Sequence, residues 1–136
     1  MYKLERRITE AFLSSGTLEG SSRREYKVGF PLPAPEAKAK NETAYILDAS
    51  LNVLSRKIDA VVENDKEVWL LESKIRLNPS ALGRALTYRE LFLKDHPQEG
   101  RSVKTGIICL DDDPAVRRIA EAQGIKVFVL PRSKLG

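Results

Sequence analysis

The sequence predicts a single α/β domain spanning residues 1–136, in which helices cover a mixed β-sheet. This length suits one domain with one hydrophobic core. Two strand-like runs at 57–63 and 68–75 flank a short polar segment, which is typical of an antiparallel hairpin. The last third reads as strand, helix and strand, which indicates a parallel crossover. A sheet with both kinds of pairing, flanked by helices, follows from these observations.

The N-terminal part predicts a helix and a short strand. Apolar residues recur with helical spacing between residues 2 and 15, at Leu4, Ile8, Ala11 and Phe12. Residues 17–24 turn to glycine and serine and are expected to lead into a strand at 25–30. Prolines then predict an exposed loop over 31–43, whereas 43–54 fits either a short helix or a strand.

The central and C-terminal elements are better defined. The run at 68–75 is apolar on both faces, which is typical of a central strand covered by helices on each side. Asn78 and Pro79 begin a buried helix that continues through 81–94. Strands are then expected at 105–110 and 125–130, and a helix at 114–123 lies between them. The acidic run before that helix, Asp111 to Asp113, is explained by helix capping.

The composition excludes several kinds of chemistry. The chain has one Cys and one His, so a disulfide framework or a zinc site built from three or four such ligands is excluded. Carboxylates, lysines, arginines and tyrosines remain, and these suit magnesium and phosphate-bearing substrates. A net charge of +4 favours a nucleic-acid partner, although only mildly. No long apolar window and no signal peptide are present, so we expect a soluble cytoplasmic protein with no membrane partner.

The central hairpin carries a charged cluster. A four-residue turn at 64–67 would place Glu63 opposite Val68, and the same register places Asp59 opposite Glu72. Opposed side chains lie about 4.5–5.5 Å apart at Cβ. Two carboxylates this close repel one another unless a cation joins them or one stays protonated. The alternative is that these charges mark a strand end at the surface, and a turn of another length would change the pairing.

The pattern Asp59 followed by Glu72, Ser73 and Lys74 resembles the signature of the PD-(D/E)xK nuclease superfamily, which has the restriction-endonuclease-like fold. Archaeal Holliday junction resolvases and RecB-type nuclease domains belong to this group. The expected element order also resembles the family core: a helix, a strand, a hairpin, a helix, then strand, helix and strand. The resemblance covers nearly the whole chain.

The resemblance implies roles for individual residues. Asp59 and Glu72 would bind a metal ion together with the main-chain carbonyl of Ser73, and Lys74 would be the catalytic lysine. Many members add a glutamate from the first helix. Glu5 borders the apolar face of that helix and is preferred over Glu10, which lies nearly opposite. The alternative for either glutamate is a solvated helix charge.

Four further residues are candidates for substrate binding. The RecB-like branch carries Gln and Tyr four residues apart after the signature strand, and this chain has Arg84 and Tyr88 at that spacing. The departure at Arg84 weakens the assignment to that branch, but an arginine can reach a phosphate. Arg56 and Lys57, just before Asp59, are a basic pair suited to a DNA backbone. The apolar periodicity favours a core position for Tyr88 over a base-stacking role.

These residues predict a nuclease that uses Mg²⁺ or Mn²⁺ to hydrolyse DNA phosphodiester bonds, including those of branched or repair DNA. One core offers one active site, so cutting both strands would need a homodimer. The alternative is a non-catalytic nucleic-acid-binding or assembly subunit with the same fold. A third possibility is an unrelated α/β domain whose hairpin charges are ordinary surface. The sequence does not distinguish DNA from RNA.

Overall fold

The computed structural model describes residues 3–29 and 56–135. The predicted loop at 31–43 and the open assignment at 43–54 lie outside these ranges. The described elements are α1 (Lys3–Ser14), β1 (Ser21–Val28), β2 (Arg56–Glu63), β3 (Glu67–Arg76), α3 (Pro79–Asp95), β4 (Ser102–Asp111), α4 (Pro114–Ala122), β5 (Ile125–Val129) and η2 (Arg132–Leu135).

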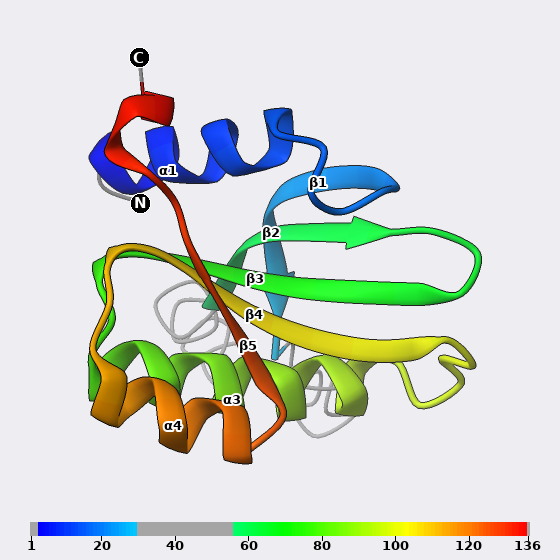
Figure 1. Ribbon diagram of the computed structural model, residues 1–136. Helices are drawn as coiled ribbons and strands as arrows, with labels where there is room; N and C mark the ends of the chain where they lie inside the picture. The colour runs from blue at the N-terminus through cyan, green and yellow to red at the C-terminus, as the bar shows by residue number, and fades with distance from the viewer. Residues whose placement is uncertain (1–2, 30–55, 136) are drawn as a thin grey trace, which may run out of the picture.

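The five strands form one mixed sheet in the order β1-β2-β3-β4-β5 (Figure 1). β1, β2 and β3 pair antiparallel, and β3, β4 and β5 pair parallel. The α/β class, the central hairpin and the C-terminal parallel crossover are therefore confirmed. Within the described residues, no helix is both long and apolar enough to cross a membrane.

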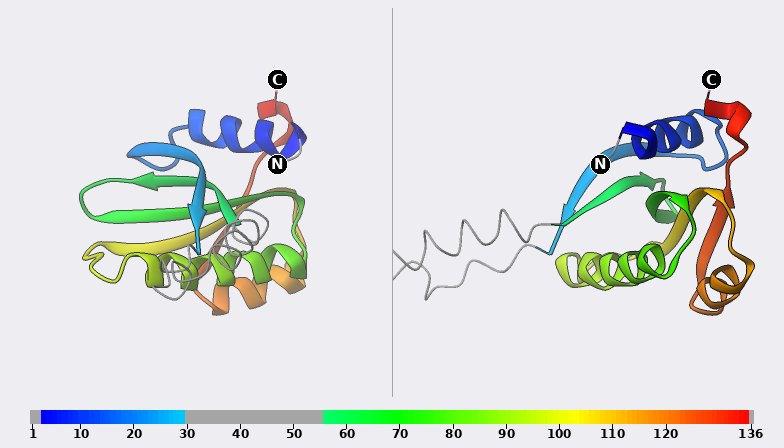
Figure 2. Two further views of the ribbon diagram at one scale, coloured as in Figure 1. Left: turned by 180° about the vertical axis from the view of Figure 1, so that it is seen from behind. Right: turned by 90° about the vertical axis from the view of Figure 1, so that its left-hand side faces the viewer.

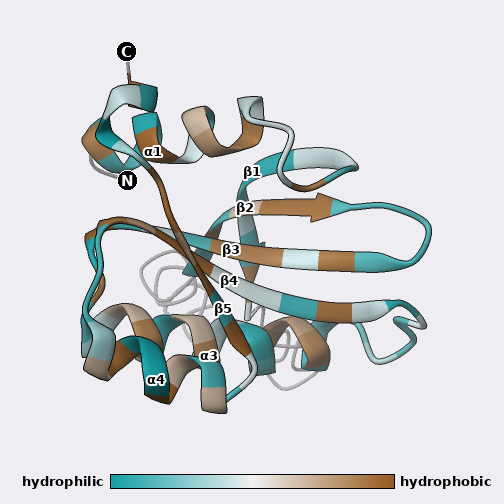
Figure 3. Ribbon diagram, in the orientation of Figure 1, coloured by the Kyte–Doolittle hydropathy of each residue, from teal (hydrophilic) through white to brown (hydrophobic). Residues whose placement is uncertain are grey.

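Helices cover both faces of the sheet. α1 lies on one face together with η2, and α3 and α4 lie on the other (Figures 1 and 2). Under α1, Phe12 packs with Trp69 and Leu71. Under α3, Leu70 packs with Tyr88. β3 thus contributes buried side chains to both faces, as its apolar sequence predicts. Hydrophobic segments of β3 are brown in the ribbon coloured by hydropathy (Figure 3).

Two sequence expectations for the termini are corrected. β1 begins at Ser21 rather than near residue 25, because this polar segment pairs with β2 at the sheet edge. Most of its side chains are exposed, so no apolar alternation is needed. Gly20 precedes it, where a side chain would clash with the carbonyl oxygen of Glu63. The short η2 helix at the C-terminus was not predicted.

The expected helix starts are confirmed by their caps. The Asn78 side chain accepts a hydrogen bond from the Ala81 N–H at 2.8 Å, with Pro79 in the first turn of α3. The Asp113 carboxylate accepts from the N–H groups of Ala115 and Val116 at the start of α4. α3 therefore begins within a few residues of the end of β3, which brings its first turns close to the charged residues of that strand.

Candidate active site

The charged cluster lies where β2 and β3 separate. The hairpin register is the predicted one, from Glu63 opposite Val68 to Ala60 opposite Leu71, and the ladder ends there. Beyond this point, side chains take over the backbone hydrogen bonds. The Ser73 N–H donates to Asp59 Oδ2 at 2.8 Å, and the Asp59 N–H donates to Glu72 Oε1 at 3.4 Å. The two carboxylates therefore cross-link the diverging strands.

The pairing of β1 with β2 is irregular opposite Asp59. The β1–β2 ladder passes from Arg24 opposite Ala60 to Tyr26 opposite Ile58, and it omits Glu25. Glu25 has a φ of 51°, a conformation that residues other than glycine rarely adopt. The sheet is therefore distorted next to Asp59, as is common beside functional sites.

Glu72 is buried as a carboxyl group, with 5% of its surface exposed. Burial and the nearby charge of Asp59 raise the pKa of Glu72 to about 8, and the Arg84 guanidinium opposes this shift. Arg84 Nε lies 3.5 Å from Glu72 Oε2. Asp59 is also buried, which raises its pKa, although the hydrogen bond from Ser73 opposes the change. The pair is therefore costly to keep doubly ionised in the absence of a bound cation.

α1 contributes the third carboxylate of the region. Glu5 Oε1 lies 4.0 Å from Lys74 Nζ, and both side chains are mostly shielded from solvent. The structure thus brings Glu5 to the site beside Lys74. Glu10, the reserve choice, instead forms an exposed ion pair with Arg24 at 2.7 Å. Glu5 is in a position to orient Lys74, and its role as a metal ligand stays a prediction.

Thr9 connects α1 to the signature strand and was missed by the sequence reasoning. Its hydroxyl donates to the Glu5 carbonyl at 3.0 Å and lies 2.6 Å from the Ser73 hydroxyl. Because Thr9 has one hydroxyl proton, Ser73 is the donor in the second bond. Thr9 is fully buried. The only signal for it in the sequence is a polar residue placed between Ile8 and Phe12 of the apolar face.

These residues surround a small cavity. Its volume is about 20 Å³, and it is lined by Glu5, Asp59, Glu72, Ser73, Lys74, Ala81 and Arg84. That space holds about one water molecule or one small cation. The cavity therefore brings together the predicted signature residues, Glu5 and Arg84.

The donor set fits a hard divalent cation. Two carboxylates at one cavity supply the oxygen ligands that Mg²⁺ and Mn²⁺ prefer. A cation between them would offset the mutual repulsion that raises the pKa of Glu72. Within the described residues, no group of three or more His, Cys, Asp or Glu side chains is arranged as a metal site. The side-chain ligands of this site would be Asp59 and Glu72, and a ligand role for Glu5 stays a prediction.

The four predicted substrate-binding residues lie in different settings. Arg84 lines the cavity, and its guanidinium carbon lies 5.4 Å from the centroid of the Tyr88 ring. Tyr88 is 6% exposed and packs in the core, so its ring supports Arg84 rather than facing solvent. Arg56 and Lys57 are exposed at the start of β2. Their contact with a substrate stays a prediction.

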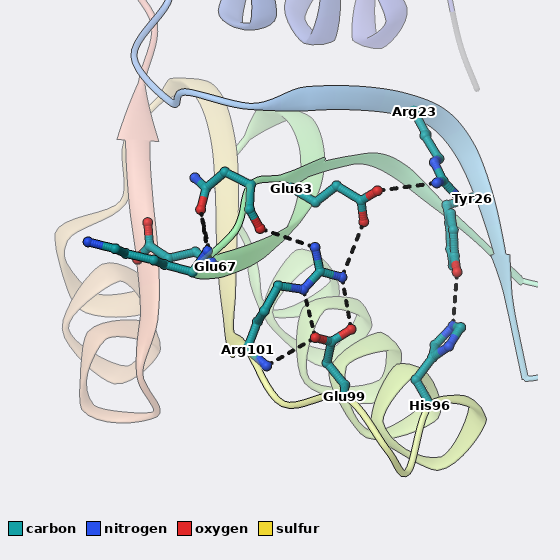
Figure 4. Close-up of polar contacts among 9 residues, drawn as sticks. Arg23, Tyr26, Glu63, Glu67, His96, Glu99 and Arg101 are labelled. Carbon is teal, nitrogen blue, oxygen red and sulfur yellow. Dashed lines mark hydrogen bonds and ion pairs between the residues drawn. The ribbon is translucent and has the colours of Figure 1, made fainter.

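The opposite end of the same hairpin is also charged, but its charges are paired (Figure 4). Arg101 donates to Glu99 at 2.7 Å and lies 3.5 Å from Glu63, which also pairs with Arg23. The Asn64 side chain accepts the N–H groups of the turn. An open depression of about 590 Å³ lies beside this turn, far along β3 from the carboxylate pair. Its lining has no buried carboxylate, so the small cavity is the better catalytic candidate.

Comparison with solved structures identifies the fold. A repair endonuclease from Pyrococcus abyssi aligns with 96% of this chain at a TM-score of 0.59 and 13% identity. The protein of unknown function AF1548 aligns with 91% of the chain at a TM-score of 0.55 and 14% identity. The chain has the restriction-endonuclease-like fold.

This fold assignment confirms the fold that the signature predicted. The chain spans about half the length of these two proteins, 47% of the first and 55% of the second. No family model and no curated protein sequence matches the chain. The roles of Asp59, Glu72 and Lys74 therefore depend on the site geometry rather than on a close relative.

Proposed function

We propose that this chain is a metal-dependent nuclease domain that hydrolyses phosphodiester bonds in DNA. The observation that carries the proposal is the buried pair Asp59 and Glu72 at the separation of β2 and β3, with Lys74 on the same cavity. The first structural neighbour is described as a repair endonuclease, which supports DNA as the substrate. We extend the proposal to branched or repair intermediates. We place this activity in the cytoplasm, as the sequence predicts.

Asp59 and Glu72, with the main-chain carbonyl of Ser73, would hold Mg²⁺ or Mn²⁺. When bound, such a cation supplies positive charge for the scissile phosphate and makes water more acidic. Asp59 is held for this task by the Ser73 N–H, and Ser73 is held by Thr9. The ligand oxygens are thus positioned before a substrate arrives, which limits the reorganisation needed during reaction.

Lys74 would act on the other side of the cavity. Its ammonium group has three donors and is oriented by Glu5. It can hold an attacking water in place and can stabilise the negative charge that develops on the phosphate. One chain contains one such cavity among its described residues, so we propose that a homodimer cuts both strands.

One observation favours a different function. Arg84 lies 3.5 Å from Glu72 and offsets part of the cost of its charge, so the site has a protein counter-cation without a metal. A subunit that binds nucleic acid without cleaving it would need no metal ion at this site. Nuclease and non-catalytic binding subunit are therefore the two candidates to separate.

A cleavage assay separates them. Fluorescent duplex, single-stranded and junction DNA, with a matched RNA, are incubated with Mg²⁺ or Mn²⁺ and with EDTA. The nuclease proposal expects metal-dependent cleavage that Asp59→Asn abolishes and that Asp65→Asn, an exposed carboxylate in the hairpin turn, leaves unchanged. DNA binding without cleavage by the wild-type protein would support the binding subunit instead.

A further inference from the structure

Arg84 pairs with Glu72 at the wall of the cavity that a cation would enter. Glu72 Oε1 faces the Asp59 N–H, and Oε2 faces Arg84 Nε at 3.5 Å. The cavity has room for about one small ion. A divalent cation in this cavity would lie next to the Arg84 guanidinium, and the two positive charges would repel one another while competing for Glu72.

The two partners differ in their freedom to move. The Glu72 side chain is 6% exposed, whereas that of Arg84 is 48% exposed. Arg84 extends from the second turn of α3, and its guanidinium lies over the fixed ring of Tyr88. A rotation of the Arg84 side chain can therefore break the ion pair with Glu72 without disturbing the core. The face of the Tyr88 ring can keep a contact with the Arg84 guanidinium after the pair is broken.

We propose that Arg84 is a built-in counter-cation: a divalent cation displaces it from Glu72, and the released guanidinium then binds a phosphate of the nucleic acid. The inference rests on the proposed function, since it assumes that Asp59 and Glu72 bind a divalent cation. An arginine suits both positions, because its planar group of donors pairs with a carboxylate or with a phosphate. Metal binding would thus prepare the site for substrate.

The structure provides a matched control on the same helix. Arg89 lies on α3 as well, but its Nη1 donates to the Gln123 carbonyl at 2.9 Å and does not line the cavity. Substitution of Arg84 or Arg89 by glutamine removes one positive charge from the same element. The effect of the Arg84 substitution on DNA affinity should depend on the metal, and the effect of the Arg89 substitution should not.

The first test uses NMR on the wild-type protein with Ca²⁺, which avoids cleavage. The Ser73 amide, which donates to Asp59, reports whether the cation binds. We expect Ca²⁺ to shift this amide and to move the Arg84 Nε–H signal toward that of a free arginine, while the Arg89 signal stays in place. A shifted Ser73 amide with an unmoved Arg84 signal would overturn this inference alone. An unmoved Ser73 amide would overturn the metal site and, with it, the inference.

The second test measures the affinity for a short DNA duplex by fluorescence anisotropy. Arg84→Gln should weaken binding about fivefold in Ca²⁺ and have almost no effect in EDTA, where Arg84 is occupied by Glu72. Arg89→Gln should cause the same change in both buffers. An equal loss of affinity for Arg84→Gln with and without Ca²⁺ would show that no release occurs and would contradict the inference.

Discussion

The two ends of the β2–β3 hairpin carry the same residue types in opposite electrostatic states. Beside the turn, Glu99 of the α3–β4 connection is held by Arg101, and this ion pair lowers the pKa of Glu99 to about 2. At the other end, burial and mutual repulsion raise the pKa of Glu72 to about 8. The turn end is neutralised by ordinary ion pairs near solvent. The separated end keeps two carboxylates buried, and this is the arrangement that a cation would stabilise.

Lysines at the two ends allow the sharpest comparison. Lys74 lies on the cavity, and Lys66 is exposed in the turn. Lys74→Met should reduce cleavage by about 100-fold or more, because it removes a positioned donor from the reacting phosphate. Lys66→Met should leave the rate unchanged. Single-turnover cleavage of labelled DNA measures both rates, and equal rates for the two variants would remove Lys74 from the mechanism.

Removing the buried charge should stabilise the metal-free protein. The raised pKa of Glu72 means that folding favours its neutral form, so stability falls as pH rises from about 4.5 toward 8. At pH 8, Glu72→Gln should therefore have a free energy of unfolding about 2 kcal/mol higher than wild type and should unfold at a higher denaturant concentration. At pH 4.5 the two proteins should differ little. Chemical denaturation in EDTA at both pH values gives this comparison. A destabilised variant at pH 8 would contradict it.

Two buried threonines provide a comparison within the core. Thr9 is hydrogen-bonded to Glu5 and Ser73, whereas the Thr105 hydroxyl is buried with no hydrogen-bond partner among the described residues. Thr9→Val should destabilise the fold by about 1–2 kcal/mol, and Thr9→Ser should restore most of this loss. Thr105→Val should be neutral or slightly stabilising, because no hydrogen bond is lost. Thermal unfolding of the three variants measures the difference, and equal losses for both valine variants would refute the assigned bonds.

The turn end should give the smallest effect, with the opposite pH dependence. The lowered pKa of Glu99 contributes stability that is present above about pH 4.5 and is lost as pH falls toward 2. Glu99→Gln should therefore be slightly less stable than wild type at pH 7 and equal to it near pH 2, with cleavage unchanged. Denaturation at several pH values checks this. If Glu99→Gln were more stable than wild type at pH 7, the ion pair with Arg101 would not stabilise the fold, and the contrast with Glu72 would be wrong.

The hairpin register could be predicted on one assumption, a four-residue turn at 64–67, and the structure has the pairing of Glu63 with Val68 that this turn produces. The same register predicts Asp59 beside Glu72, and the two residues are neighbours although the backbone ladder ends at Ala60 and Leu71. The start of β1 could not be predicted, because an edge strand paired on one side needs no apolar pattern. The Arg84–Glu72 ion pair could not be predicted either, because the spacing of residues does not determine where a long side chain points.

The central claim is that Asp59 and Glu72 form a divalent-cation site. Isothermal titration calorimetry with Mn²⁺ on wild type, Asp59→Asn and Asp65→Asn tests it most directly, and it does not depend on knowing the substrate. We predict one binding site per chain in wild type and in Asp65→Asn, with binding lost in Asp59→Asn. Absence of Mn²⁺ binding to the wild-type protein, or equal binding in all three proteins, would contradict the claim.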